Sequence, residues 1–329
     1  MDRRLALAML GTMGGMLLPV RARAQKAQLP SIGFLSTASP DLYSDRVVTF
    51  LQGLKELGYT EGQNVDILYR WAEGQSERLP GLAAELVQRQ VSVIVAAGGT
   101  PSALAAKAAT TTIPIVFGVA TDPVAAGLVI SLNRPGGNLT GILNLNVEVG
   151  PKRLELLHEL LPKATVFAVL IDPTYRSVSD PFLRRVQAIA QSLGIQLHAL
   201  NASSERDFDT VFAMLTRLRA SGLIIAPGTL FSAESERLAA LTVRHGVPAI
   251  FQYRPFVAAG GLISYGSSET EYYRLVGAYA ARILKGEKPA DLPVQQSTKV
   301  ELLINLKTAR LLGIAIPQAL IARADEVIQ

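Results

Sequence analysis

Residues 91–110 read VSVIVAAGGTPSALAAKAAT, and this stretch carries the pattern that decides the fold. Val91–Ala97 is a short apolar run of the kind found in strands that are buried on both faces of a parallel sheet. The break Gly98–Pro101 ends this run, and Ser102–Thr110 is an alanine-rich segment with high helix propensity. The stretch therefore predicts a buried strand, a turn and a helix, which together make one unit of an α/β fold.

The same alternation of strand and helix extends in both directions along the chain. Apolar stripes at helical spacing separate short β-rich runs up to about residue 266. The predicted strands are residues 31–35, 65–69, 91–97, 113–119 and 138–144, followed by 165–171, 195–200, 223–226, 249–252 and 262–265. Two successive sets of about five strands, each crossed over by helices, predict an α/β fold of two doubly wound parallel-sheet lobes.

The last 60 or so residues break this rhythm. A helix is predicted from about Glu269 to Lys285, then an extended stretch, Val294–Ile304, and a short terminal helix. These elements are too few for a third lobe, so we expect them to complete the first two. The predicted organisation is lobe one from residues 29–144 plus about 266–295, and lobe two from 145–265 plus about 300–329. Several chain crossings between lobes make a multi-strand hinge, which suits closure around a ligand.

Composition and charge exclude several classes of protein. With 49% hydrophobic and 18% charged residues, the chain is not intrinsically disordered. It has no cysteine, so disulfides, thiolate nucleophiles and zinc–sulfur sites are absent. Residues 1–24 hold four arginines and one aspartate, so +3 of the net charge of +5 lies there and the remainder is nearly balanced. Because no basic stripe remains, nucleic acid is not an expected partner.

The first 24 residues have the pattern of an export signal. Arg3-Arg4 precedes the apolar stretch Leu5–Leu18, and Ala22-Arg23-Ala24 fits a small-x-small cleavage site. The apolar stretch is shorter than the roughly 20 residues that span a bilayer. We therefore predict an exported protein, cleaved near Ala24. The general secretory and twin-arginine routes both remain open.

Polar residues and glycines gather where the predicted strands end. In open parallel sheets, ligands bind beyond the carboxyl ends of strands, where helix N-termini point. These candidates are Ser36, Thr37, Gly99, Thr100, Ser102, Thr121 and Asp122 in the first half, and Asp172, Gly228 and Tyr253 in the second. Hydroxyl and N–H groups here can receive a carboxylate, or they can simply cap helices. Asp122 could likewise hold a ligand ammonium group or cap the turn that Pro123 opens.

The sequence contains few of the patterns that mark enzymes. No two of the three histidines have metal-ligand spacing, and there is no nucleophile elbow, Walker loop or complete dinucleotide fingerprint. We expect no cofactor, no metal and no catalysis. The alternative is a two-lobed α/β enzyme acting on a small substrate, for which Asp122 and Asp172 would be the candidate acid and base.

Several longer segments, taken in order, resemble a known family. They are QGLKELGYTEGQN at 52–64, GGTPSALAAKAAT at 98–110, DPVAAGLV at 122–129, NRPGGNLTG at 133–141, AGGLISYG at 259–266, ILKGEKPADLPVQQ at 283–296 and LIARADEVI at 320–328. On these motifs the chain resembles a bacterial family of ABC-transporter substrate-binding proteins with the periplasmic-binding type I fold. That family includes tryptophan- and tyrosine-binding members.

The resemblance implies a periplasmic receptor that captures a small organic solute between its lobes and delivers it to a membrane permease. An aromatic or other amino acid is the expected solute, and a monomer is the expected state. In such folds the strand-end groups Ser36, Thr100, Ser102 and Asp122 would meet the solute from lobe one, and Asp172, Gly228 and Tyr253 from lobe two. An aromatic solute would also need an aromatic wall, for which the candidates are Tyr43, Tyr175, Phe231 and Tyr253. A sugar-responsive transcription regulator shares the fold, but it would begin with a helix-turn-helix where this chain has a leader.

Overall fold

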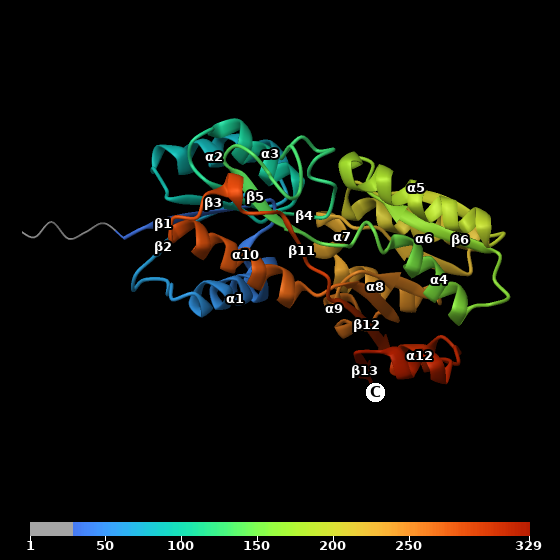
Figure 1. The fold of residues 1–329 in the computed structure, drawn as a ribbon. Helices are drawn as coiled ribbons and strands as arrows, with labels where there is room; N and C mark the ends of the chain where they lie inside the picture. Colours follow the sequence, from blue (N-terminus) through green and yellow to red (C-terminus); the bar gives the residue numbers. More distant parts are fainter. Residues whose placement is uncertain (1–28) are drawn as a thin grey trace, which may run out of the picture.

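The computed structural model describes residues 29–329, which form two α/β lobes joined side by side (Figure 1). The predicted leader, residues 1–24, lies outside the described residues. Each lobe is a sheet covered by helices on both faces, so the prediction of two doubly wound lobes is confirmed. Within residues 29–329, no helix has both the length and the apolar character needed to cross a bilayer.

Lobe one contains a six-stranded parallel sheet in the order β11-β5-β4-β3-β1-β2. Its strands are β1 (Ser31–Ser36), β2 (Asp66–Trp71), β3 (Val93–Ala96), β4 (Ile115–Val119), β5 (Leu139–Leu143) and β11 (Gln295–Gln296). One face packs against α2 (Leu79–Gln88) and α3 (Thr100–Ala109), and the other against α1 (Pro40–Glu56) and α10 (Glu269–Leu284). Every residue of β3 is buried, as its apolar run predicts.

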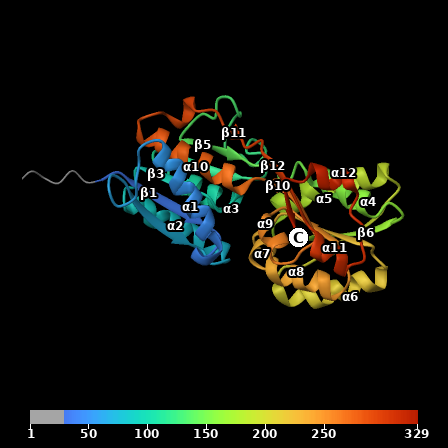
Figure 2. The same ribbon diagram turned by 90° about the horizontal axis from the view of Figure 1, so that it is seen from below.

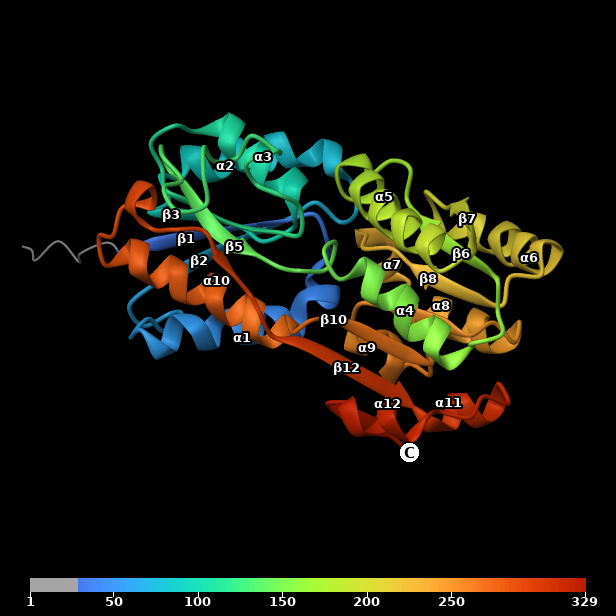
Figure 3. The ribbon, with the colours of Figure 1, turned by 45° about the vertical axis from the view of Figure 1, so that its right-hand side comes forward.

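Lobe two contains a seven-stranded sheet in the order β13-β12-β10-β9-β8-β6-β7. Its strands are β6 (Val166–Ile171), β7 (Gln196–Asn201), β8 (Gly222–Ile225), β9 (Ala249–Phe251), β10 (Ile263–Ser267), β12 (Val300–Asn305) and β13 (Glu326–Ile328). Its helices are α4 (Gly150–Leu160), α5 (Arg176–Ser192), α6 (Phe208–Leu218), α7 (Thr229–Ala233), α8 (Ser235–Arg244), α9 (Arg254–Ala258), α11 (Leu306–Leu311) and α12 (Gln318–Arg323). The C-terminal segment therefore belongs to lobe two, beside which α11 and α12 lie in Figure 3.

One strand of lobe two departs from the predicted parallel arrangement. β12 pairs antiparallel to β10. The reason is the path of the chain: β10 runs toward lobe one, whereas β12 returns from lobe one and must point the opposite way (Figure 3). All ten predicted strands of the two sets are present, with ends shifted by no more than two residues.

Within residues 29–329, the chain crosses between the lobes three times. The crossings are Asn144–Val149 after β5, Ser267–Ser268 at the end of β10 and Ser297–Lys299 before β12. The first and second are joined by a hydrogen bond from the backbone N–H of Leu145 to Ser267 Oγ, at 2.8 Å. The second and third are joined by one from the N–H of Ser268 to the carbonyl of Lys299, at 2.9 Å. These bonds hold the three segments together as one hinge.

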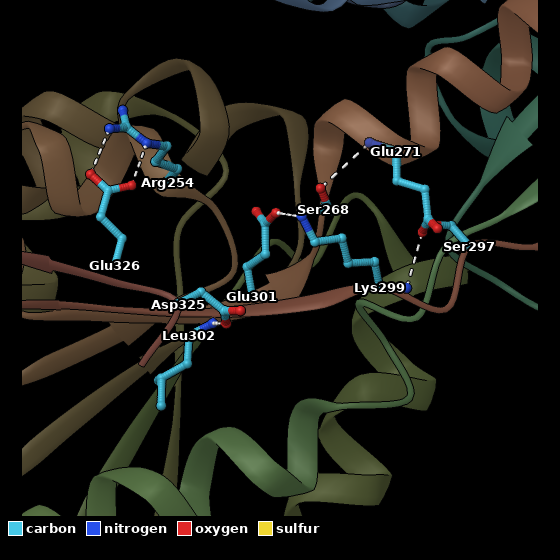
Figure 4. Close-up of polar contacts among 9 residues, drawn as sticks. All are labelled: Arg254, Ser268, Glu271, Ser297, Lys299, Glu301, Leu302, Asp325 and Glu326. Carbon is cyan, nitrogen blue, oxygen red and sulfur yellow. Dashed lines mark hydrogen bonds and ion pairs between the residues drawn. The ribbon is translucent and has the colours of Figure 1, made fainter. Parts of the chain in front are cut away.

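Glu271, in the first turn of α10, strengthens the contact between the second and third crossings (Figure 4). Its carboxylate accepts hydrogen bonds from Ser297 Oγ at 2.6 Å and from the backbone N–H of Lys299 at 3.0 Å. Its own N–H donates to Ser268 Oγ, which caps α10. One carboxylate therefore links the start of the lobe-one helix to the strand that enters lobe two.

Helices α1 and α10 lie side by side in lobe one at very short range (Figure 2). The contact is made by one glycine from each helix. A Cβ on Gly53 would collide with the carbonyl oxygen of Arg274, and a Cβ on Gly277 would collide with that of Phe50. Residues far apart in the sequence thus share one layer of lobe one because neither helix has a side chain at the crossing point.

Candidate functional site

A pocket lies between the two lobes. Its lining includes five tyrosines, of which three come from lobe one (Tyr43, Tyr272 and Tyr273) and two from lobe two (Tyr175 and Tyr253). Its cavity of about 100 Å³ is larger than a buried water needs. Tyrosine side chains from both lobes therefore line a site that only the two lobes together can form.

Tyr175 reaches across the pocket from lobe two to lobe one. A Cβ on Gly99 would lie only 2.8 Å from the Tyr175 hydroxyl, and Gly99 has a φ of +84°, which favours glycine. Burial raises the pKa of Tyr175 above its ordinary value, so its hydroxyl keeps its proton and can donate. Gly99 thus lets the tyrosine hydroxyl approach the start of α3.

Among the described residues 29–329, Arg46, on α1, is the one charged residue in the lining. Its Nε donates to the Glu269 carboxylate at 2.7 Å, and its side chain is only 14% exposed. Its Cζ lies 4.5 Å from the ring centroid of Tyr43 and 5.5 Å from that of Tyr253, so it contacts aromatic rings of both lobes. Burial acts to lower the pKa of Arg46, but attraction to Glu269 and the tyrosines outweighs it and the pKa stands above its usual value.

Asn144 and Gln252 bring amide groups to the lining. Gln252 directly follows β9 and is 4% exposed. Its Oε1 is buried and accepts no hydrogen bond from residues 29–329. An orphaned buried acceptor beside a pocket is available to a donor on a bound molecule.

The structure brings some of the sequence-predicted site residues together and keeps others apart. Gly99, Tyr175, Gly228 and Tyr253 line the pocket, as does Tyr43 from the predicted aromatic wall. Phe231 does not; it is fully buried in lobe two, with its ring centroid 6.5 Å from that of Phe208.

The predicted hydroxyl residues lie outside the pocket lining. All of them are hydrogen-bonded in the protein interior except Ser102, whose Oγ has no partner within residues 29–329. All are buried: Ser36, Thr37, Thr100, Ser102 and Thr121. Thr37 Oγ1 donates to the Gly98 carbonyl at 3.0 Å, and the hydroxyls of Thr100 and Thr121 are 2.8 Å apart. These bonds tie neighbouring strand ends together and so position the glycines that do face the pocket.

The two predicted carboxylates also lie outside the lining. Asp122 is exposed, and its Oδ1 accepts from the N–H of Val124 at 2.8 Å and, more weakly, from that of Ala125. Asp172 is buried, and its Oδ1 accepts from the N–H and hydroxyl of Thr174. Both carboxylates therefore organise the turns that follow their strands.

Sequence reasoning missed Arg46, Tyr272, Tyr273 and the two amides. Arg46 stands three residues after Tyr43, so both share a face in the first turns of α1, a spacing that the sequence shows. Tyr272 and Tyr273 follow the second crossing, which brings the start of α10 to the pocket. In the part of the chain that the structure describes, no three His, Asp or Glu side chains gather as metal ligands.

The sequence pattern of a family described as "ABC transporter substrate binding protein" matches residues 32–328. The chain belongs to this family. Its members are receptors that bind small solutes and deliver them to a permease, and they are typically exported or held at the cell surface. A curated relative, the tyrosine-binding protein of Clostridioides difficile (strain R20291), is 28% identical over 264 residues, which are 80% of this chain and 75% of the relative.

Two solved structures show how the lobes are arranged. An ABC domain in complex with L-Trp from Streptococcus pneumonia matches with a TM-score of 0.83 and 26% identity. The ligand-free, open structure of a substrate-binding protein with adhesive properties from Clostridium difficile matches with a TM-score of 0.68 and 25% identity. Each match covers 92% of this chain and all of the other. Identity and coverage are nearly equal, and the structure here is more similar to the L-Trp complex than to the open, ligand-free structure.

Proposed function

We propose that this receptor captures a small solute with an aromatic ring, of the size of tyrosine or tryptophan, and holds it in the tyrosine-lined pocket. The observation that carries the proposal is the set of five tyrosines contributed by both lobes. Aromatic side chains prefer offset or edge-to-face contacts with another ring, and such contacts add about 0.5–1.5 kcal/mol beyond burial of area. The tyrosine-binding relative and the L-Trp complex support the same class of solute.

The proposal includes the setting in which the receptor works. The leader would direct export to the periplasm and be removed near Ala24, and the mature receptor would act as a monomer on a free solute. It would release the solute unchanged to its permease, with no catalysis, and it would bind no nucleic acid. The nearly balanced charge outside the leader agrees with this setting.

Binding and closure test the proposal together. Titration calorimetry of residues 25–329 against L-tyrosine, L-tryptophan and L-leucine should give binding of an aromatic compound and much weaker binding of leucine. X-ray scattering should show a smaller radius of gyration with the bound compound, and chromatography should recover that compound unchanged. Binding of leucine alone, or chemical conversion of the ligand, would refute the proposal.

Tyr253 gives the sharpest variant for this site. It follows β9 at the start of α9, and its ring forms part of the lobe-two wall. Tyr253→Ala should weaken binding of an aromatic solute by about 1–2 kcal/mol, and Tyr253→Phe should bind nearly as well as the parent. Tyr59→Ala is the matched control, because this partly buried tyrosine lies outside the lining and should not change affinity.

A further inference from the structure

The described residues of the pocket lining carry a positive charge but no negative charge. The lining contains one cationic side chain, that of Arg46, and among residues 29–329 it contains no Asp or Glu. Glu269 lies beyond Arg46 and lines a neighbouring pocket instead. The carboxylates of Asp122 and Asp172 are engaged by their own turns, as described above. An anionic group on a solute therefore meets a charged partner here, whereas a cationic group meets none.

Arg46 has unused hydrogen-bonding capacity. A guanidinium carries five N–H donors in a rigid fork that fits a carboxylate with two parallel hydrogen bonds. Within the described residues, the hydrogen bonds of Arg46 to protein consist of the single contact from Nε to Glu269. The ring centroids of Tyr43, Tyr253 and Tyr273 lie 4.5, 5.5 and 5.9 Å from Cζ, and the Arg46 side chain is only 14% exposed. A charged hydrogen bond to an anionic acceptor is stronger in such a partly desolvated setting than in bulk water.

The tyrosine rings also fix the direction of the guanidinium. Tyr43 and Tyr273 belong to lobe one, and Tyr253 belongs to lobe two, so the set of rings around Arg46 is complete only when the lobes are together. Glu269 fixes the Nε side of the fork. A carboxylate that binds the remaining donors would therefore complete a contact that spans both lobes.

We propose that Arg46 recognises the carboxylate of the solute and that the receptor does not require an α-ammonium group. Its solutes would then be aromatic carboxylic acids as well as aromatic amino acids. An ammonium group, where present, would meet only neutral groups such as the orphaned Oε1 of Gln252 and the tyrosine rings. This inference rests on the proposed function, because it assumes that the ring of the solute occupies the tyrosine-lined pocket.

Three compounds that share one ring separate the two charged groups. They are L-tyrosine, 3-(4-hydroxyphenyl)propionate, which lacks the ammonium group, and tyramine, which lacks the carboxylate. Calorimetry of residues 25–329 should give the propionate an affinity within about tenfold of L-tyrosine. Tyramine should bind about 10–100-fold more weakly than L-tyrosine, as expected for the loss of a charged hydrogen bond.

Variants assign the effect to Arg46. Arg46→Met leaves Glu269 unpaired, so the double variant Arg46→Met with Glu269→Gln removes both charges and keeps the volume. In either variant, L-tyrosine and the propionate should lose about tenfold or more in affinity. In the double variant, which leaves no unpaired charge, the affinity for tyramine should change little. Arg237→Met, at an exposed ion pair on lobe two, is the control and should leave all three affinities unchanged.

The outcomes distinguish the inference from the proposed function. Tyramine binding as tightly as L-tyrosine, or a propionate affinity 100-fold below that of L-tyrosine, would overturn the inference and leave an aromatic receptor. Unchanged carboxylate affinities in the folded double variant would also overturn it. If none of the three compounds and no aromatic amino acid binds, the proposed function fails, and the inference fails with it.

Discussion

Gly53→Ala should destabilise the protein although alanine is the better helix former. The added Cβ would collide with the Arg274 carbonyl oxygen and lie 3.0 Å from the Ala278 nitrogen. Both are backbone atoms, which cannot turn aside as a side chain would, so α1 and α10 must move apart. Overpacking of this kind costs about 1–3 kcal/mol. The higher helix propensity of alanine returns about 0.5–1 kcal/mol, which leaves a net loss of about 1 kcal/mol and at most about 2.5 kcal/mol.

Gly81→Ala in α2 is the matched control for this prediction. Gly81 also lies within a helix, but it is exposed and nothing approaches its added Cβ within 4 Å. This variant should gain about 0.5–1 kcal/mol, so the difference between the two variants measures the overpacking alone. Urea unfolding of the unliganded protein, followed by far-UV circular dichroism, gives both values. If Gly53→Ala stabilises the protein as much as Gly81→Ala does, then α1 and α10 do not lie close enough for an added Cβ to collide.

Two further predictions concern single carboxylates. Glu271→Ala removes two hinge hydrogen bonds to a charged group, so it should lower the free energy of unfolding by about 1.5–3 kcal/mol and increase the radius of gyration of the unliganded protein. Glu287→Ala breaks only an exposed ion pair with Arg282, so in the same urea assay it should lower the free energy of unfolding by less than about 1 kcal/mol. Asp207 accepts hydrogen bonds from the N–H groups of Ser203 and Ser204, which lower its pKa below the ordinary value of an aspartate. Its stabilisation is therefore present above the pKa of the unfolded chain and is lost as the pH falls through the lower pKa of the folded protein. Unfolding measured from about pH 5 to about pH 3 should therefore depend less steeply on pH in Asp207→Asn, and an unchanged slope would contradict this role.

The fold was predictable because buried parallel strands leave a local signature. β3 and β6 are continuous apolar runs between helices with apolar stripes, and no long-range information is needed to recognise them. The helices α7 and α9 were not predicted, because five residues are too few to show a helical period. β12 is antiparallel because the chain re-enters lobe two from lobe one at this point, and no local sequence pattern contains that information.

The pocket was predictable only in part, because a strand-end residue can face either of two ways. Gly99 and Tyr253 face the pocket, whereas Thr37 and Thr100 turn inward and satisfy neighbouring groups. A glycine, threonine or tyrosine at a strand end is compatible with facing the pocket and with facing the protein interior. Only the position of the adjacent strand decides between these two orientations. Arg46 was missed for a different reason: its importance comes from Tyr253, which lies in the other lobe and more than 200 residues away.

The α1–α10 contact also has a consequence for the order in which the chain can fold. Lobe one begins with β1, but α10 supplies Tyr272, Val276 and Ala280 to the core that covers one face of its sheet. During synthesis, α1 alone can cover that face until α10 emerges, when most of the polypeptide, including nearly all of lobe two, has been made. The N-terminal half thus cannot become a finished domain on its own, and the nascent chain remains incompletely folded until its last fifth emerges.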